Sequence, residues 1–423
     1  MSQPKLIQIF EYQSLRIGQP IGKDKDGKEV KFNKHHLELL QQYRGDREEE
    51  KFNYYSLTHN GVTFKHYVGV LNVGGLQIEI LPKADKLSNN NNKGIWKTHL
   101  ITMLRTVYKL HAQAPTNAHQ QLKNSSVLDV FLQRFLDEVE KLLHVGLIKT
   151  YRKETDNRNS LKGKIAWRKH LSKNVVHKER FYVTYTTYDR NHIMNRVLYK
   201  TLQVIPSVTS NSFIANRAKT LAFEFPELID INVTDNTFST MSFDRKSEGY
   251  HDAMSIAKLI LLNYMPDSQI QSHNVIALMF DMNKLWEEYV YVMLRRHLKG
   301  IEVTAQEQKV LWYTNGATKR IKPDIVINIK KSNYKKAYIL DTKWKIPDGT
   351  PSDADLHQLY TYLKFFDVEK VAFVYPATLL QHSKIKGFFN ERTGQEPNCD
   401  MIFLRLNDKD RGSFVNPIKD WLS

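Results

Sequence analysis

The pattern of hydrophobic and polar positions changes along the chain, and its first part predicts strands. Residues 1 to about 85 alternate between the two types over short stretches. The segment 63–83 alternates on both sides of a Gly-Gly pair, which is typical of a β-hairpin. Segments 95–110 and 126–147 carry hydrophobic residues at helical spacing. We therefore expect a β-rich N-terminal domain over residues 1–150, with helices toward its end.

The last third of the chain has the pattern of an α/β core. Residues 273–300 predict one long helix that ends at a glycine. It is followed by four predicted elements: strands at 321–329 and 336–344, a helix at 353–366 and a hydrophobic strand at 371–376. A strand, a helix and a second strand form a crossover unit, which favours parallel pairing within a mixed sheet. The expected fold class is α/β in this part and α+β for the whole chain.

A basic region separates these two parts. Between residues 148 and 202, Lys and Arg alternate with Tyr, Trp and Phe, and strand-like pieces lead into a helix. This mixture suits phosphate contacts and base stacking, although the exposed surface of a strand-rich linker would have a similar composition. We assign residues 151–265 to a basic mixed α/β region that faces DNA or links its neighbours, and residues 266–423 to the C-terminal domain.

Composition narrows the class of partner. The 423 residues include 62 Lys and Arg against 45 Asp and Glu, a formal net charge of +17. This surplus favours a polyanionic partner, with nucleic acid first and a membrane surface second. The single cysteine, Cys399, excludes an internal disulfide and a thiolate metal cage. The sequence has no signal-peptide pattern, and no hydrophobic run approaches the ~18 residues that a membrane span needs. We therefore expect a soluble protein in the cytoplasm.

One apparent nucleotide-binding motif fails at its last position. Residues 22–29, GKDKDGKE, follow a phosphate-binding loop as far as the lysine, but Glu29 stands where a Ser or Thr would bind magnesium. Asp26-Gly27 is better explained as a tight hairpin turn. The sequence also lacks a His-Glu-x-x-His zinc helix and a Gly-x-Ser-x-Gly elbow. We therefore exclude nucleotide hydrolysis by this chain.

Two aspartates on neighbouring predicted strands form the candidate active site. Because side chains alternate along a strand, Asp341 and Lys343 point the same way. If the connecting turn centres on 331–334, Asp324 falls opposite Asp341, roughly 5 Å away at the backbone. Two carboxylates this close repel each other unless a cation lies between them, and Mg²⁺ prefers oxygen ligands. Lys343 would then face the reacting phosphate or its attacking water.

The alternative is a solvated hairpin with an Asp–Lys ion pair at its surface. Such an ion pair would contribute about 0–1 kcal/mol to stability. Two features favour an embedded metal site instead. Of three Pro-Asp dipeptides in the chain, only the one at Asp324 precedes an Asp-x-Lys tripeptide within the reach of one hairpin. Tyr338, Leu340 and Trp344 make the opposite face of the second strand hydrophobic, which predicts that this face is buried.

The motif formed by Pro323-Asp324 and Asp341-x-Lys343 resembles that of the PD-(D/E)xK nucleases. The resemblance implies a C-terminal core of the restriction-endonuclease type, with a mixed sheet flanked by helices. It also implies that the two aspartates bind Mg²⁺ and that an upstream helix adds a carboxylate. We assign that role to Glu287, which directly follows an aromatic residue, with Glu288 as the alternative.

The helix predicted after the motif carries a second point of resemblance. Gln358 and Tyr362 match the Gln-x-x-x-Tyr of a subset of these nucleases, where the two residues would support the site or face DNA. A tyrosine packed four residues after its helical neighbour is also common without any such role.

Four longer segments, at 161–171, 188–202, 280–294 and 339–345, are similar to McrC-like proteins, the nuclease subunits of McrBC modification-dependent restriction systems. The resemblance implies a Mg²⁺-dependent DNA endonuclease subunit. Its partner would be an McrB-like AAA+ GTPase hexamer that recognises modified DNA. The N-terminal region would dock on that ring and stimulate GTP hydrolysis.

Two other functions remain open from the sequence. A non-catalytic DNA-binding or regulatory subunit could keep the nuclease fold, although the three core residues of the motif are intact. A self-sufficient nuclease without a motor would cleave DNA efficiently as an isolated chain.

Overall fold

The structure is a computed structural model. It describes residues 5–23, 29–45, 54–73, 76–83, 92–108, 126–265, 275–331, 334–345, 347, 349–377, 383–390, 396–406 and 412–423. The chain forms two compact units, one made of Met1–Val127 with Ala277–Ser423 and the other of Leu128–Ile276. The protein has mixed α and β structure in several sheets, as the sequence predicts. None of the helices in the described ranges is long and hydrophobic enough to cross a membrane.

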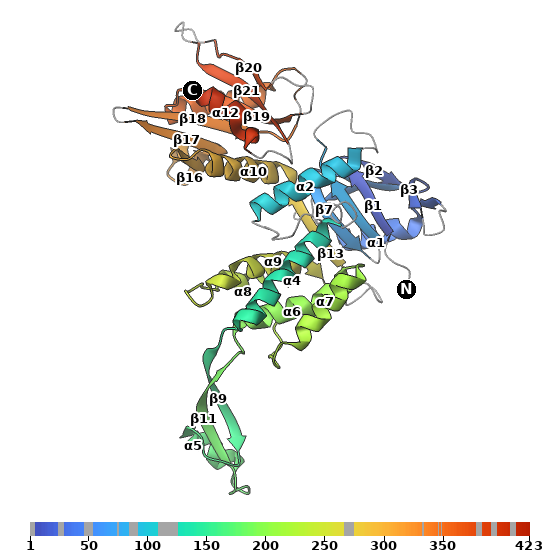
Figure 1. Ribbon diagram of the computed structural model, residues 1–423, viewed down its shortest axis with the longest axis vertical. Coiled ribbons are helices and arrows are strands. Elements are labelled where there is room, and N and C mark those ends of the chain that lie inside the picture. Colours follow the sequence, from blue (N-terminus) through green and yellow to red (C-terminus); the bar gives the residue numbers. More distant parts are fainter. Residues whose placement is uncertain are drawn as a thin grey trace. The chain divides into compact units, whose positions relative to one another are not determined.

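The N-terminal part of the first unit is rich in strands (Figure 1). Its elements are β1 (Lys5–Phe10), β2 (Ser14–Arg16), β3 (Pro20–Lys23), β4 (Glu29–Lys31), α1 (Lys34–Gly45), β5 (Tyr55–Thr58), β6 (Gly61–Phe64), β7 (Tyr67–Val73), β8 (Leu76–Leu81) and α2 (Lys93–Val107). β7 and β8 pair antiparallel, so the hairpin expected at 63–83 is confirmed. β3 and β4 also pair antiparallel, and the turn expected at Asp26-Gly27 lies outside the described residues.

Four neighbouring strands of the five-stranded N-terminal sheet have the order β1-β8-β7-β13, where β13 is Val275–Asp281. β1 runs parallel to β8. Gly69 of β7 lies so close to β13 that a side-chain carbon there would be 2.1 Å from the carbonyl oxygen of Leu278. The sheet also contains a buried charge, because Glu79 of β8 forms a 2.9 Å ion pair with Lys97 of α2. This sheet therefore joins β1, β7 and β8 to the strand that leads into the C-terminal part.

The C-terminal part is built on a six-stranded sheet with the order β14-β17-β18-β19-β21-β20. Its elements are α10 (Met282–His297), β14 (Glu302–Ala305), β15 (Lys309–Thr314), β16 (Ala317–Ile321), β17 (Ile325–Lys331), β18 (Tyr334–Thr342), α11 (Asp353–Phe366), β19 (Lys370–Ala377), β20 (Lys384–Ile385), β21 (Asn398–Arg405), η4 (Ser413–Val415) and α12 (Asn416–Leu422). β17 and β18 are antiparallel, and β18, β19 and β21 are parallel. The predicted crossover unit and the mixed sheet are both confirmed.

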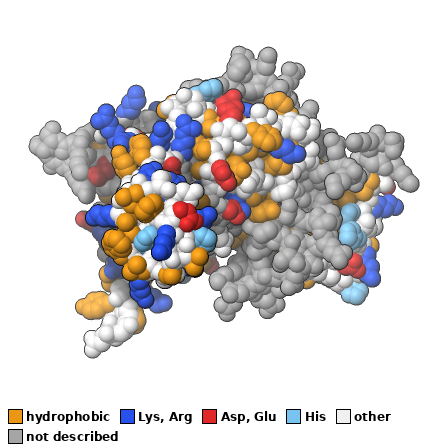
Figure 2. All heavy atoms as spheres, turned by 90° about the horizontal axis from the view of Figure 1, so that it is seen from below, with side chains coloured by type: hydrophobic (Ala, Val, Ile, Leu, Met, Phe, Trp, Pro, Cys, Tyr) orange, Lys and Arg blue, Asp and Glu red, His pale blue; other side chains and the backbone are white. Residues whose placement is uncertain are grey.

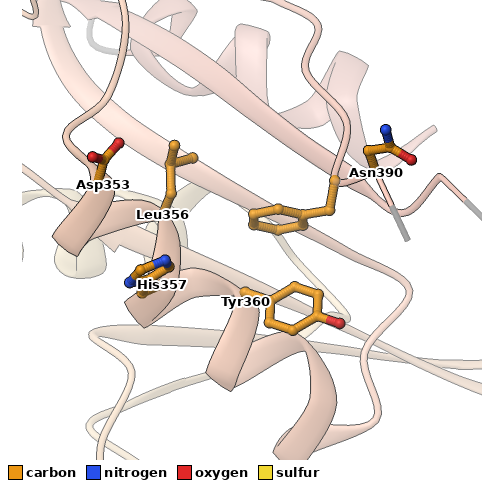
Figure 3. Close-up of a pocket in the computed structure, with 6 residues that line it drawn as sticks. Asp353, Leu356, His357, Tyr360 and Asn390 are labelled. Atoms are coloured by element: carbon orange, nitrogen blue, oxygen red, sulfur yellow. The ribbon is translucent and has the colours of Figure 1, made fainter. Parts of the chain in front are cut away.

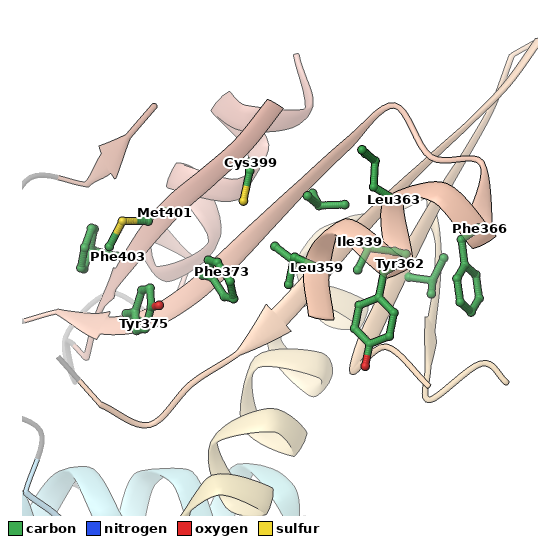
Figure 4. Packing of buried hydrophobic residues seen from close by; sticks show 12 residues of the cluster. Ile339, Leu359, Tyr362, Leu363, Phe366, Phe373, Tyr375, Cys399, Met401 and Phe403 are labelled. Atoms are coloured by element: carbon green, nitrogen blue, oxygen red, sulfur yellow. The ribbon is translucent and has the colours of Figure 1, made fainter. Parts of the chain in front are cut away.

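Helices cover both faces of this sheet. α11 packs on the face that presents Val326, Ile339 and Phe373, in the hydrophobic cluster of Figure 4. On the other face, the indole of Trp286 in α10 donates to the carbonyl of Val374, and Tyr338 packs against Trp421 of α12. Because both faces are covered, a charged side chain on the central strands is removed from water unless it lies at a strand end.

The prediction of one long helix over residues 273–300 is only partly correct. Residues 275–281 form β13, and the helix α10 starts at Met282. A continuous hydrophobic run of this length has no periodicity that separates a buried strand from a buried helix. The boundary lies at Asp281, whose carboxylate accepts from the backbone N–H groups of Asn283 and Lys284 and so caps the helix.

The second unit combines helices with a long β-ribbon. Its elements are α4 (Val127–Val145), β9 (Thr150–Arg158), β10 (Lys164–Ile165), α5 (Trp167–Lys173), β11 (Phe181–Asp189), α6 (Ile193–Val208), α7 (Ser212–Phe223), α8 (Asp235–Ser239), η3 (Glu248–Tyr250), α9 (His251–Leu262) and β12 (Tyr264–Met265). β9 and β11 pair over nine residues, and Figure 1 shows this ribbon extending away from the helices of the same unit. On the face drawn in Figure 2, the described Lys and Arg side chains are dispersed among hydrophobic ones.

The two compact units differ from the three domains expected from the sequence. The sequence places boundaries near residues 150 and 265, whereas residues up to 127 pack in one unit with residues from 277 onward. The functional assignments of the three segments stay predictions.

Candidate active site

The register of β17 and β18 brings the two motif aspartates to the same place. Lys331 pairs with Tyr334 and Ile325 pairs with Leu340, so Asp324, one residue before β17, falls opposite Asp341. This is the register that the sequence predicts. The carboxylate of Asp324 crosses to β18, where its Oδ2 accepts from the backbone N–H of Thr342 at 2.7 Å and from the Thr342 hydroxyl at 2.9 Å.

Asp341 is a buried carboxylate with little hydrogen bonding. It is 0% exposed, and its Oδ1 has no hydrogen-bond partner among the described residues. Its Oδ2 lies 2.8 Å from the Nζ of Lys343 in an ion pair. The solvated Asp–Lys surface pair that the sequence left open is therefore wrong, because the aspartate is enclosed in the sheet. Tyr338, Leu340 and Trp344 are buried as predicted.

Burial dominates the electrostatics of both aspartates. It raises the pKa of Asp341 to about 7, and the nearby charge of Asp324 adds to the effect. It also raises the pKa of Asp324, against the hydrogen bonds from Thr342. For Lys343, burial alone would lower the pKa, but the charges of Asp341 and Asp355 outweigh burial and raise it. The two buried carboxylates therefore repel each other, and a bound cation would reduce this repulsion.

Glu287 interacts electrostatically with Asp324, whereas Glu288 does not. Burial raises the pKa of Glu287, and Asp324 is the next largest cause. The Glu287 carboxylate accepts a 2.8 Å hydrogen bond from Gln306, whose backbone N–H donates to the carbonyl oxygen of Asp324. The pKa of Glu288 is raised by burial, without a contribution from the motif aspartates. The geometry thus agrees with the choice of Glu287, while its role stays a prediction.

Gln358 and Tyr362 are connected to the site through hydrogen bonds. The side-chain oxygen of Gln358 accepts from Lys343 at 3.2 Å, and its amide nitrogen donates to the Tyr362 hydroxyl at 2.8 Å. That hydroxyl donates in turn to the carbonyl of Lys322 at 3.0 Å. Tyr362 is 4% exposed, so its side chain lies inside the protein.

Asp355 is a site residue that the sequence interpretation missed. It lies 3.4 Å from Lys343 and 2.6 Å from Lys345, and it accepts from the Ser352 hydroxyl at 2.7 Å. Burial would raise the pKa of Asp355, but the hydrogen bonds from Lys345 and Ser352 outweigh it and lower the pKa. Helical spacing could have found this residue, because positions 355, 358 and 362 fall on one face of a helix.

The residues present suit a hard divalent cation. The free Oδ1 of buried Asp341 and the second oxygen of Asp324, which neither Thr342 bond uses, are the oxygen ligands that Mg²⁺ prefers. Within the described ranges, no three His, Cys, Asp or Glu side chains converge into a complete metal-binding group. Mg²⁺ commonly completes its shell with water and substrate phosphates, so two carboxylates are enough.

A separate pocket of about 270 Å³ lies beside α11 (Figure 3). It is lined by Asp353, Leu356, His357, Tyr360, Phe389 and Asn390. None of the motif residues lines it. The candidate chemistry is therefore at the end of β18 and not in this pocket.

These features define a mixed α/β protein in which a sheet end gathers paired carboxylates and a lysine. A sequence model described as "McrBC 5-methylcytosine restriction system component" matches residues 62–376. The chain belongs to this family of McrBC restriction system components.

Similar proteins agree with this assignment. The type IV methyl-directed restriction enzyme EcoKMcrBC of Escherichia coli K12 is 21% identical over 232 residues, which are 53% of this chain and 66% of that protein. The alignment thus spans slightly less than two thirds of the relative. A chain from a half-complex of Thermococcus gammatolerans McrB AAA+ hexamers with bound McrC matches with a TM-score of 0.67 and 20% identity, covering 99% of this chain and 98% of that one. A chain of the T. gammatolerans McrBC complex matches with a TM-score of 0.50 and 20% identity, covering 70% and 88%.

Proposed function

We propose that this chain is the Mg²⁺-dependent DNA endonuclease subunit of an McrBC-like modification-dependent restriction complex, with a core of the PD-(D/E)xK type. The observation that carries the proposal is the buried carboxylate of Asp341, whose Oδ1 has no hydrogen-bond partner among the described residues. This carboxylate lies opposite Asp324 and forms a 2.8 Å ion pair with Lys343. A carboxylate pair and a lysine at one strand end suit phosphodiester hydrolysis by water, without a covalent intermediate.

Each residue of the site has a distinct part in this proposal. Asp324 and Asp341 hold the cation, and Glu287 supports the site from α10. Bound Mg²⁺ would supply Lewis-acid polarisation of the phosphate and a more acidic water. Lys343 keeps its ammonium charge at the scissile phosphate, where it stabilises negative charge that develops in the transition state. Gln358 holds the Lys343 ammonium in place, and Tyr362 holds Gln358.

The proposal includes a motor partner and a modified substrate. One T. gammatolerans relative is described in an assembly of McrB AAA+ hexamers with bound McrC, and the other in an McrBC complex. We extend an AAA+ partner to this chain and propose that it is a GTPase. The family description names 5-methylcytosine, so the substrate would be methylated DNA recognised by the partner. A motor supplied by another chain agrees with the failed nucleotide-binding motif at residues 22–29.

The test is plasmid cleavage by Asp341→Ala with Mg²⁺ and the motor present, alongside thermal unfolding of the same protein. We expect cleavage to be lost and folding to be retained. Asp420→Asn, at an exposed position of α12, is the matched control and should cleave normally. Retained cleavage by Asp341→Ala would contradict the metal assignment, and loss of folding would favour a structural role for Asp341.

A further inference from the structure

The β15–β16 hairpin is exposed except at its two end residues, Lys309 and Ile321. Every residue from 310 to 320 is exposed. The hairpin nevertheless carries four large hydrophobic side chains with these exposed fractions: Val310 44%, Leu311 40%, Trp312 53% and Tyr313 77%. Single exposed hydrophobic residues are ordinary, but four in succession on a two-stranded ribbon indicate an interaction surface.

The charge of the hairpin has one sign. Residues 308–323 contain no Asp or Glu and four cationic residues: Lys309, Lys319, Arg320 and Lys322. The strand register places Lys319 opposite Trp312 and Arg320 opposite Val310, with Leu311 as the extra residue of a bulge. Lys319 therefore lies across from an aromatic residue, and Arg320 across from a hydrophobic one.

The base of the hairpin lies next to Asp324 in the chain and is anchored on α11. Its second strand ends at Ile321, three residues before Asp324, and Ile321 packs on the hydrophobic cluster beneath α11. At the start of its first strand, Lys309 donates to the carbonyl of Phe365 at 3.2 Å and lies 4.6 Å from the ring centre of Phe366. A ligand held at the base of this hairpin would therefore lie close to Asp324.

We propose that the β15–β16 hairpin binds duplex DNA next to the phosphate that is cut. Lys319 and Arg320 contact backbone phosphates, and Trp312 and Tyr313 contact the sugars and base edges of a groove. This inference rests on the proposed function, since it assigns the hairpin to the substrate of that site.

Two arguments favour duplex DNA over a protein as the occupant. The absence of any carboxylate in residues 308–323 makes the surface complementary to a polyanion. A two-stranded β-ribbon also fits the major groove of B-DNA, and strands of this length extend about 20 Å, close to the width of the duplex. Docking of a protein on the exposed hydrophobic residues would not require that every charge on the hairpin be positive.

The experiment measures fluorescence anisotropy of a labelled DNA duplex, about three helical turns long, with the full chain in EDTA. Binding without Mg²⁺ keeps the result independent of cleavage. Lys319→Ala/Arg320→Ala should weaken binding at least ~10-fold at low salt and reduce the salt slope by about two. Trp312→Ala/Tyr313→Ala should weaken binding roughly 10-fold while the salt slope stays the same.

Matched controls exclude a general effect of charge or of surface change. Lys299→Ala/Lys419→Ala removes the same charge at two other exposed positions, and Phe388→Ala removes another exposed aromatic side chain. Both controls should bind as the wild type does. All variants should keep the wild-type unfolding temperature, because the substituted side chains are exposed.

Four outcomes would overturn the inference. They are unchanged binding by both hairpin variants, an equal loss in the controls, a hairpin effect seen with single strands only, and no duplex binding by the wild type. Unchanged DNA binding with loss of assembly with the motor would identify a protein-docking surface instead. If the wild type bound through the hairpin but never cleaved with Mg²⁺ and motor, the proposed nuclease function would fail while the hairpin assignment stood.

Discussion

The indole Nε1 of Trp344 donates a 2.8 Å hydrogen bond to the buried carboxylate of Glu11, 333 positions earlier in the chain. The same carboxylate oxygen accepts from the backbone N–H of Lys83 at 2.8 Å, and the backbone N–H of Glu11 donates to the carbonyl of Leu81. Trp344 directly follows Lys343. One buried carboxylate therefore connects the N-terminal sheet to the segment that carries the candidate catalytic lysine.

Glu11 makes folding stability depend on pH. Burial raises its pKa from 4.5 to about 7, and its Oε2 has no hydrogen-bond partner among the described residues. Below pH 4.5 the carboxyl is protonated in the folded and unfolded states alike. Between pH 4.5 and 7 only the folded state holds the proton, so the contribution of Glu11 to stability falls as pH rises and stays low above pH 7.

We expect Glu11→Gln to stabilise the protein at pH 8 by up to about 3 kcal/mol and to lose this advantage near pH 4.5. Glutamine keeps an acceptor for Trp344 and cannot ionise. Denaturant unfolding at the two pH values measures the difference. Glu224→Gln, at an exposed position, should change stability little at either pH. An equal effect of Glu11→Gln at both pH values would show that Glu11 does not titrate in this way.

Metal binding can be tested without cleavage. Mg²⁺ at ten times its dissociation constant should stabilise the wild type by about 1.4 kcal/mol, because a ligand that binds only the folded state adds RT ln(1 + [L]/Kd). Asp324→Asn and Asp341→Asn should each lose most of this gain, measured as a shift in Tm. Asp353→Asn lies on the nearby helix α11 but outside the carboxylate pair, and should keep the gain. If Mg²⁺ did not change the Tm of the wild-type protein, this result would argue against a metal site at these residues.

DNA binding by the whole chain should be strongly dependent on salt. The formal charge of +17 and the absence of a recognisable base-reading motif predict mainly phosphate contacts. Each neutralised phosphate contributes about −0.9 to the slope of log K against log salt, so affinity should fall steeply between low and physiological salt. Anisotropy titrations over that range measure the slope. A flat dependence, or a strong preference for one short sequence, would mean that the surplus charge serves another purpose.

The local elements of the site could be predicted because their signals are local. Alternation along two short strands and a basic turn fixed the register that sets Asp324 opposite Asp341. The spacing of hydrophobic residues predicted α11 at its observed bounds, and Ser352 caps its start by accepting from the backbone N–H of Asp355. These features depend on residues within about 20 positions of one another.

Other features could not be predicted because they arise from distant contacts. Nothing near Glu11 in the sequence indicates a bond to Trp344. Gln306 meets Glu287 only because α10 and the loop before β15 pack together. The strand β13 was predicted as helix, since a buried hydrophobic run carries no periodicity that separates the two.

The same long-range contacts limit the use of deletions. Removing residues 1–150 would take β7 and β8 from the sheet that also contains β13, and Glu11 from its bond to Trp344. Such a deletion would disturb the C-terminal core together with any docking surface. Point variants are therefore the sharper way to separate partner stimulation from DNA cleavage.

The most direct test of the account is the GTPase rate and the nicking rate of Lys343→Ala, measured on one preparation with the motor partner. The substitution removes one ammonium group beside Asp341 and leaves the packing of Tyr338, Leu340 and Trp344 in place. Nicking should slow at least ~100-fold, equivalent to about 3 kcal/mol of barrier, while stimulation of GTP hydrolysis stays near the wild-type level. Lys419→Ala, which removes one exposed charge on α12, should keep both activities. Wild-type nicking by folded Lys343→Ala, or loss of both activities together, would contradict the account.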